Sequence, residues 1–301
     1  MKFSLSYIIA TRNRLPFLQI TLGKLIDELQ PGEEIVVVDG DSSDGTKKYL
    51  QKMYDDGKIH QFISAPDVNQ AHGWNKAMLM ARGDIIKKII DDDVFDFSAI
   101  QHCKQFMLDN PQVDVCISNC LNVDVNEQKN TGLISRQKEF NKWKNGTVNC
   151  FTFNDVYMLI RRSVLSYAGL YDTQFTMMDW EYSLRLSYLK LNIAYYTGCV
   201  ALPVATPGNV TSTVSKTILK REEEIGKCKY GYQGDHADIT LWSKLKIIVG
   251  KTIYKGNGTG SNDQFNSGAS LRELYNNLYK IIVDYNAAHT GTFLSIEQKT
   301  N

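Results

Sequence analysis

The sequence predicts an α/β fold, a doubly wound and mostly parallel sheet followed by a helical C-terminal extension. Apolar runs of strand length alternate with segments of helical periodicity over the first hundred residues, which is the order expected of consecutive βαβ units. The run at 34–39 is continuously apolar at its centre, as in a strand buried on both faces of a parallel sheet. Strand signals fade after residue 220, where helical periodicity continues.

Each element of the first part follows from local signals. The predicted elements are, in order, a strand at 5–10, a helix at 15–29, a strand at 34–39, a helix opening within 41–54, a strand at 58–64, a helix at 71–81 and a strand at 84–90. The first helix should stop before Pro31 and Gly32. Ser43 and Asp44 are capping candidates, and Asp44 before Gly-Thr is expected to be a helix cap rather than a ligand.

The rest of the chain has shorter elements. Strands are expected at 113–119 and 192–198, and helices around 161–168, at 179–189 and at 271–285, the last one amphipathic. We expect one domain over 1–220, with halves at 1–110 and 111–220, followed by a mainly helical tail at 221–301. The boundary is placed near 216–225.

Bulk composition excludes several classes of protein. The formal net charge is +1 and no basic run stands out, so nucleic acid is not expected as a partner. The first fourteen residues read as a strand rather than a signal peptide, and no apolar stretch approaches 18 residues. Six cysteines without a CxxC pair suggest reduced core thiols, and hence a cytoplasmic protein. Asn-x-Thr matches at Asn145, Asn209 and Asn257 are then expected to be chance.

Carboxylates gather where two predicted strands end. Asp39 ends the second strand, and Asp91, Asp92 and Asp93 follow the fourth. Three adjacent carboxylates repel one another and lose hydration if they are buried, unless a cation or a solvated turn relieves them. An exposed acidic turn would explain an isolated triplet. In open α/β sheets, however, ligands bind outside the carboxyl ends of the strands, so both acidic groups are expected to face one crevice.

Two common cofactor motifs are absent after the first strand. Residues 10–16 read ATRNRLP, which matches neither the GxGxxG of dinucleotide-binding folds nor the GxxxxGK[ST] of P-loop enzymes. A crevice with acids at both strand ends suits a divalent cation, Mn²⁺ or Mg²⁺, that holds a diphosphate. The pattern therefore points to a nucleotide-linked substrate.

Four stretches resemble the inverting family-two glycosyltransferases with the GT-A fold. They are SYIIATRNR (6–14), EIVVVDGDSSDGT (34–46), APDVNQAHGWNKAMLMARGDIIKKIIDDD (65–93) and MLIRRSVLSYAGLYDTQFTMMDWEYSLRL (158–186). They resemble, in this order, the nucleotide loop, the second strand and its turn, the run into the DxD motif, and the segment with the catalytic base. The resemblance spans about 1–215, and it implies a nucleotide-sugar-binding half at 1–110 and an acceptor half at 111–220.

The resemblance implies roles on the donor side. Thr11 and Arg14 would border the nucleotide, and Asp39 would accept a hydrogen bond from the base, typically uracil. Asp67 and Asn75 match positions that line the donor pocket. For Asp67, an Asx-type turn after the preceding proline is an equally good interpretation.

The resemblance also assigns the acidic triplet. Asp91 and Asp92 would reach the ribose and the metal shell, and Asp93 would be the direct metal ligand, with Asp91 as the second metal-site carboxylate. Because Mn²⁺ and Mg²⁺ take hard oxygen donors and are completed by phosphate oxygens, one or two carboxylates suffice. Ile90 stands where many members have another acid, so the motif is read as the triplet itself.

On the acceptor side, the match makes Asp179 the general base that deprotonates the acceptor hydroxyl. Glu181 would orient the acceptor or support the base, and Arg185 would contact either the first turns of the same helix or the diphosphate. Asp179 is also placed to be a helix cap, which does not exclude catalysis. Met178 stands where a Glu often precedes the base, so the register between Asp179 and Glu181 stays open.

The expected activity is metal-dependent, inverting transfer of a sugar, UDP-linked by preference, to a glycan or lipid-linked acceptor of a surface polysaccharide. Many members have a His near 204–212; none is present there, and His236 is the nearest later one. The segment 241–255, with four lysines, is interpreted as a basic amphipathic helix that either docks on an anionic membrane or packs on the domain. A catalytically silent nucleotide-sugar-binding scaffold is the alternative; a sugar nucleotidyltransferase ranks lower, because it needs a glycine-rich loop after strand one.

Overall fold

The computed structural model describes residues 3–123, 131–206, 215–234 and 268–295. Its strands are β1 (Leu5–Thr11), β2 (Glu33–Asp39), β3 (Gln61–Ser64), β4 (Ile85–Lys88), β5 (Val94–Phe95), β6 (Val115–Val123), β7 (Thr131–Ile134), β8 (Met158–Arg161), β9 (Ile193–Leu202) and β10 (Phe293–Leu294). Its helices are α1 (Leu15–Glu28), α2 (Thr46–Asp55), α3 (Gln70–Met80), α4 (Phe97–Asp109), α5 (Gln137–Lys144), α6 (Leu165–Ala168), α7 (Met178–Tyr188), α9 (Lys216–Tyr230) and α11 (Gly268–Ala288). Short 3-10 turns, η1 (Asp155–Tyr157) and η2 (Arg162–Val164), flank β8.

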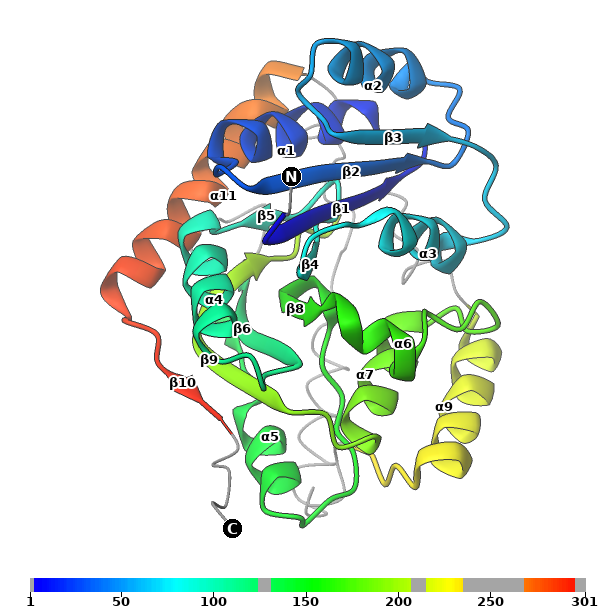
Figure 1. Cartoon of the computed structure of the whole chain (residues 1–301), viewed down its shortest axis with the longest axis vertical. Helices are drawn as coiled ribbons and strands as arrows, with labels where there is room; N and C mark the ends of the chain where they lie inside the picture. Colours follow the sequence, from blue (N-terminus) through cyan, green and yellow to red (C-terminus); the bar gives the residue numbers. More distant parts are fainter. Residues whose placement is uncertain (1–2, 124–130, 207–214, 235–267, 296–301) are drawn as a thin grey trace, which may run out of the picture.

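The strands form one mixed sheet in the order β10-β9-β6-β8-β4-β1-β2-β3 (Figure 1). The four strands β3, β2, β1 and β4 are parallel neighbours. Beyond β4 the sheet continues through antiparallel pairing with β8, and β6 and β9 form a further parallel pair. The predicted fold class is confirmed, a mostly parallel α/β sheet with helices on its faces.

Local hydrogen bonds explain where the elements differ from the predicted ranges. The strand expected at 58–64 begins only at Gln61, because the N–H of Lys58 donates to the carbonyl of Met53 at 2.8 Å and the chain is still closing α2. The N-cap of α2 is Gly45, one residue after the expected Asp44. Asp44 still holds the start of the helix, because it accepts hydrogen bonds from the N–H and the hydroxyl of Thr46, at 3.1 and 2.6 Å.

The C-terminal helix α11 belongs to the same hydrophobic core as the sheet. It buries Leu271, Leu274, Tyr275, Leu278 and Ile282, and it lies against β5 and β9. The strand β10 then pairs with β9 at the sheet edge. The domain boundary near 216–225 stays a prediction.

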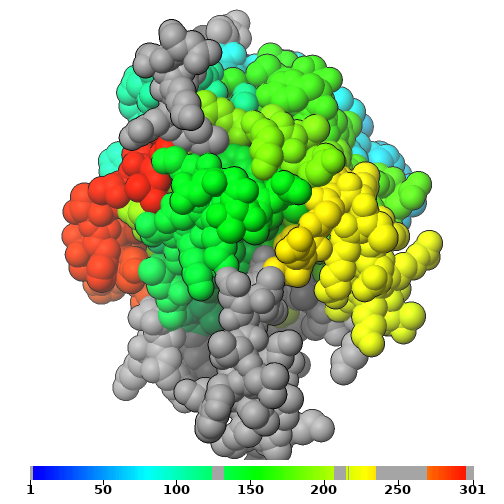
Figure 2. Space-filling model, turned by 90° about the horizontal axis from the view of Figure 1, so that it is seen from below, coloured from blue at the N-terminus to red at the C-terminus, as the bar shows by residue number. Residues whose placement is uncertain are grey.

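The helix α9 lies instead against α7, in a small cluster of its own. Cys150, Leu184 and Tyr230 form this cluster, with Trp180 and Tyr232 packed against it. Seen from below, α9 (yellow) and the C-terminal segment (orange to red) lie on opposite sides of the acceptor half (green) (Figure 2).

Five of the six cysteines are buried and free, and Cys228 is exposed, as the sequence predicted for core thiols. Among the described helices, none combines the length and the apolar character that crossing a bilayer requires. The basic segment 241–255, His236, Asn209 and Asn257 lie outside the described residues.

Candidate active site

The acidic turn lies directly after β4, next to the carboxyl end of β1. The chain runs from β1 outward to β2 and β3, and returns to the other side of β1 as β4, so the two strands flank the point at which an open α/β sheet forms its ligand crevice. The hydroxyl of Thr11, the last residue of β1, donates to Oδ2 of Asp91 at 2.5 Å. The turn is thereby fixed to the neighbouring strand.

Two side chains hold the carboxylate of Asp92. Arg14 and Thr206 both donate to its Oδ2, and the guanidinium of Arg14 lies 4.6 Å from the ring centre of Phe17. On the main-chain side, the hydroxyl of Tyr275 in α11 donates to the Asp92 carbonyl at 2.5 Å. Residues far apart in the sequence therefore fix one turn from both sides.

Asp93 receives one hydrogen bond, from the N–H of Val204 to its Oδ1 at 2.8 Å. All three carboxylates of the turn are about 95% buried, with 4–5% exposure. Burial, and then the charge of Asp92, raise the pKa of Asp91 to about 7 and hold the pKa of Asp93 well above its ordinary range. Hard oxygen donors whose ionised forms are disfavoured by burial suit a divalent cation such as Mn²⁺ or Mg²⁺, which would favour the ionised carboxylates. No three His, Cys, Asp or Glu side chains of the described residues form a metal site on their own, so the fit requires substrate oxygens as well.

Asp39 lies at the same end of the sheet. The strand register aligns Thr11 with Asp39 and Asp39 with Ser64. The Asp39 carboxylate is fully buried and accepts from the hydroxyls of Ser42 and Ser64 at 2.5 and 2.7 Å. The N–H of Ser42 also donates to both oxygens, at 3.3 and 3.2 Å. Each oxygen therefore already has two protein donors, and a further donor would have to share one of them.

Asp67 is held by an ion pair and by two glycines. Its Oδ1 lies 2.8 Å from Nζ of Lys76. A Cβ at Gly40 or Gly73 would come within 3.0 or 2.7 Å of its Oδ2, so both positions need glycine for the carboxylate to lie between them.

Asn75 joins α3 to the loop before α7. Its side-chain amide donates to the carbonyl of Tyr171 and accepts from the N–H of Tyr171, each at 2.9 Å. Both ends of the amide are thus used within the protein, and Asn75 positions this loop.

On the acceptor side, Asp179 lies in the first turn of α7 and is partly exposed. Burial, and next the negative charge of Asp155, raise its pKa to about 6. A carboxylate with this pKa is ionised at neutral pH and is a better proton acceptor than an ordinary Asp.

A buried ionic network lies between the acidic turn and Asp179. The ammonium of Lys88, at the end of β4, contacts both carboxylate oxygens of Asp155 at 2.9 and 2.8 Å, and the hydroxyl of Tyr171 donates to the same carboxylate at 2.5 Å. The Lys88 charge lowers the pKa of both Asp93 and Asp179, in part offsetting their burial. One ammonium therefore acts on both the predicted metal ligand, Asp93, and the predicted base, Asp179.

Glu181 and Arg185 pair with each other instead of facing Asp179. Glu181 is fully buried, and both its oxygens accept from the Arg185 guanidinium. The hydroxyl of Tyr230 in α9 also donates to Glu181, and Arg185 donates to the carbonyls of Ala168 and Leu170 at 2.8 Å. Arg185 was expected to contact either the first turns of its own helix or the diphosphate. The structure has the first of these contacts, with Glu181. Glu181 has no exposed oxygen for a substrate proton.

Residues 6–168 match the family model Glycosyl transferase family 2, which is more than half of the 301 residues. The chain belongs to glycosyl transferase family 2. The family is a class of inverting glycosyltransferases with the GT-A fold. The matched range contains every donor-side residue discussed above up to Asp93, whereas Asp179, Glu181 and Arg185 lie beyond it.

Similar proteins support the same assignment. A segment of 105 residues is 27% identical to TuaG of Bacillus subtilis, named as a glycosyltransferase of teichuronic acid biosynthesis. This match covers 35% of this family 2 chain and 42% of TuaG, so it spans less than half of that relative.

Two solved structures share the fold. Staphylococcus aureus TarS 1-349, in complex with UDP-GlcNAc, has a TM-score of 0.60 at 16% identity, over 78% of this chain and 69% of that one. The mannosyltransferase PcManGT of Pyrobaculum calidifontis, in complex with GDP-Man and Mn²⁺, also has a TM-score of 0.60, at 14% identity over 96% of this chain and 88% of that one.

Several residues of the site were missed by the sequence analysis. Thr206 lies in the stretch 204–212, where the resemblance leads one to expect a His, and its hydroxyl donates to Asp92. Lys88 had a visible signal, because a charged pair interrupts an otherwise apolar strand at 84–90. Asp155, Tyr171 and Tyr275 had none, since only the tertiary structure brings them to the turn or to Lys88.

Proposed function

We propose that this family 2 protein transfers a sugar, with inversion, from a UDP-linked donor to a hydroxyl of a glycan or lipid-linked acceptor in surface polysaccharide synthesis. The observation that carries the proposal is that the Lys88 ammonium acts on both the acidic turn and Asp179, so these carboxylates share one charged environment. One group of carboxylates suits a nucleoside diphosphate with its cation, and the other suits a hydroxyl nucleophile. The name of TuaG supports the polysaccharide setting.

On the donor side, Asp39 would accept a hydrogen bond from an N–H of the base, while Thr11 and Arg14 border the nucleotide. The choice of uracil rests on the resemblance and on the UDP-GlcNAc in TarS; GDP-Man in PcManGT makes guanine the competing base. Asp67 and Asn75 would shape the donor pocket, with Asp92 near the ribose.

Asp93 and Asp91 would hold Mn²⁺ or Mg²⁺ together with diphosphate oxygens. When bound, the ion supplies positive charge that stabilises the departing nucleoside diphosphate. The protein itself supplies the burial and the hydrogen bonds from Thr11 and Val204 that orient these carboxylates.

Asp179 would accept the proton of the acceptor hydroxyl. The hydroxyl oxygen forms a bond to the anomeric carbon as the bond from that carbon to the phosphate oxygen breaks, and the diphosphate leaves with the electron pair. Attack from the face opposite the leaving group inverts the configuration. Glu181 and Arg185 would act behind the base, by fixing the first turns of α7.

A thermal-shift panel of UDP, GDP, dTDP and CMP, each with and without Mn²⁺, tests the donor half. A ligand that binds only the folded state raises the Tm, so UDP with Mn²⁺ should stabilise the wild type. Asp93→Asn should lose this shift. The asparagine still offers an oxygen that accepts a hydrogen bond from the Val204 N–H. Asp109→Ala, at an exposed carboxylate at the end of α4, is the control and should keep it.

The outcomes separate the rival functions. A shift with GDP alone would replace uracil by guanine. Nucleotide binding without turnover on any acceptor would favour the silent scaffold, and no shift with any nucleotide would contradict the transferase proposal.

A further inference from the structure

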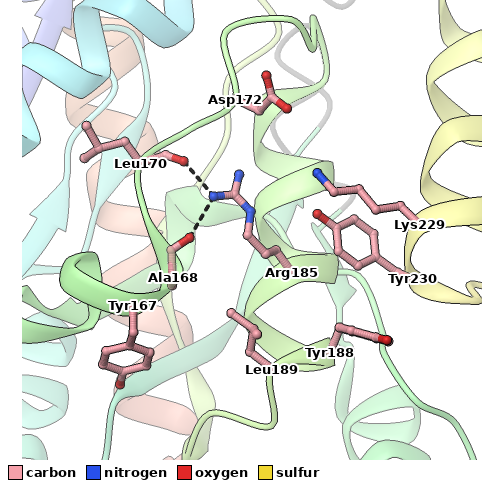
Figure 3. A pocket seen from close by; sticks show the side chains of 9 residues that line it. All are labelled: Tyr167, Ala168, Leu170, Asp172, Arg185, Tyr188, Leu189, Lys229 and Tyr230. Atoms are coloured by element: carbon pink, nitrogen blue, oxygen red, sulfur yellow. Dashed lines mark hydrogen bonds between the residues drawn. The ribbon is translucent and has the colours of Figure 1, made fainter.

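A second cavity lies on the acceptor half, at the far end of α7 from Asp179 (Figure 3). Its volume is about 560 Å³, within the range of sites that hold small ligands. Three segments supply its walls: the end of α6 with the following loop, the last turn of α7, and the last turn of α9. The lining residues are Tyr167, Ala168, Leu170, Asp172, Arg185, Tyr188, Leu189, Lys229 and Tyr230.

Exposed aromatic rings are concentrated at this cavity. Among the described residues, the large hydrophobic side chains that are exposed include three tyrosines, Tyr54, Tyr167 and Tyr188, and two of them line it. Tyr167 is 53% exposed although its hydroxyl donates to Asp114 at 2.8 Å, and Tyr188 is 46% exposed beside the buried ring of Tyr230. A tyrosine offers a flat apolar face together with a polar edge, which suits the C–H face and the hydroxyls of a sugar ring.

Polar groups of both signs also line the cavity. The Arg185 guanidinium is fixed by the carbonyls of Ala168 and Leu170 and by Glu181. The side chain of Lys229 is 49% exposed, with Nζ 3.6 Å from Oε1 of Glu181. The side chains of Lys229, Arg185 and Asp172 converge in the close-up (Figure 3). The lining holds two cations and one carboxylate, and the buried Glu181 behind it pairs with Arg185. Donors and an acceptor in one cavity suit a ligand rich in hydroxyls.

The cavity is connected to the proposed base through one rigid helix. Arg185 follows Asp179 by six residues in α7, which is about 9 Å along the axis at about 1.5 Å per residue. Glu181 lies between them and is fully buried against Arg185 and Tyr230. A ligand in the cavity is therefore held at a fixed distance from the reacting hydroxyl.

We propose that this cavity is a second saccharide subsite, which binds a sugar of the acceptor glycan remote from the reacting hydroxyl. This assignment deepens the proposed function. It rests on that function, because the bound glycan is an acceptor only if the protein is a glycosyltransferase. Tyr188 and Tyr167 stack on the sugar, while Lys229 and Asp172 hydrogen-bond to its hydroxyls. The site therefore determines specificity for acceptor glycans longer than the reacting sugar alone.

The test is binding of the full chain to an array of oligosaccharides from bacterial surface polysaccharides, without nucleotide. The wild type should bind a subset of the oligosaccharides. Tyr188→Ala should weaken this binding by at least about tenfold, equal to about 1.4 kcal/mol. Tyr188→Phe should retain it, because the aromatic ring remains. The matched control is Tyr54→Ala, which removes another tyrosine with 46% exposure from α2 and should bind like the wild type.

Either of two results would overturn the subsite: no binding of any oligosaccharide by the wild type, or binding that Tyr188→Ala leaves intact. The failure of the proposed function looks different. In that case no nucleotide shifts the Tm, while oligosaccharide binding that depends on Tyr188 persists and the cavity remains a glycan site.

Discussion

Asp179 combines a partly exposed position with an environment that disfavours its charge. Burial and the neighbouring Asp155 raise its pKa to about 6, although Lys88 counteracts the rise. An aspartate that is ionised at neutral pH but more basic than usual is suited to remove a proton from a hydroxyl. The same feature has a cost in stability, because the folded protein must keep an unfavourable charge.

This cost gives a pH-dependent prediction. Since the pKa of Asp179 is raised in the folded state, its protonated form stabilises the protein below about pH 4, and this contribution is lost as pH rises through about 6. Asp179→Asn should therefore have a higher Tm than the wild type at pH 7, with the difference shrinking toward pH 4. Thermal denaturation across this range measures it.

The same substitution should reduce kcat/KM by about 10²–10⁴, the usual contribution of a general base. The wild-type kcat/KM should increase with pH up to about 6 and then level off. Asp109→Asn, at an exposed carboxylate, should change neither the Tm profile nor the rate. A wild-type rate independent of pH between 5 and 7 would argue against Asp179 as the base.

Individual residues of the donor site were predictable where sequence order fixes their position. Asp39 and Asp91 follow strands of a parallel sheet, and such strand ends meet at one edge. The contacts of Glu181 and Arg185 were not predictable, because a helix allows several contacts at this spacing. Tertiary packing brings Tyr230 to Glu181, and the catalytic roles of Glu181 and Arg185 stay predictions.

At the scale of elements, the contact between α7 and α9 depends on a glycine in α9, which has no side chain. A Cβ at Gly226, in the middle of α9, would lie 2.3 Å from Cη2 of Trp180 and 3.3 Å from Cδ1 of Leu184. The glycine lets the two helices approach, and this approach brings Tyr230 to Glu181. The docking of α9 therefore supports both the base helix and the cavity in Figure 3.

We expect Gly226→Ala to destabilise the protein by about 1–3 kcal/mol, the usual cost of overpacking, with faster amide exchange in α9. Gly23→Ala is the matched control, since Gly23 lies within α1 and a Cβ there meets nothing within 4 Å. It should stabilise the protein by about 0.5–1 kcal/mol through the usual advantage of alanine in a helix. Equal effects of the two substitutions would contradict the close contact.

The alternation of strands and helices up to residue 90 was predictable, because buried parallel strands leave strong apolar runs. Strands such as β5 and β10, of two residues each, have no periodicity to detect. The helix α11 was expected from its amphipathic pattern, but its docking site on β5 and β9 was not, since periodicity identifies an apolar face without its partner.

At the scale of the whole molecule, α11 and β10 complete the core of the sheet rather than forming a core of their own. Five α11 side chains are at most 4% exposed, and each contributes about 1.5–3 kcal/mol when fully buried. Their sum is comparable to the entire stability of a typical domain, about 5–15 kcal/mol.

Ending the chain at residue 267 should therefore abolish cooperative unfolding, as measured by circular dichroism during urea titration. A chain that ends at residue 295 retains α11 and β10 and should unfold like the full-length protein. A cooperative transition of the 267-residue chain with an unchanged midpoint would show that the core does not need α11.

The hydrogen bond from Tyr275 to the Asp92 carbonyl joins residues 183 positions apart. During translation, Thr11 and Arg14 are made before the acidic turn, but the helix that covers its main chain emerges only after nearly two hundred further residues. The acidic turn can therefore contact β1 long before it can contact α11, so we expect the proposed donor site to be completed in two stages. A ribosome-bound chain that has not yet exposed Tyr275 should not retain the nucleotide donor.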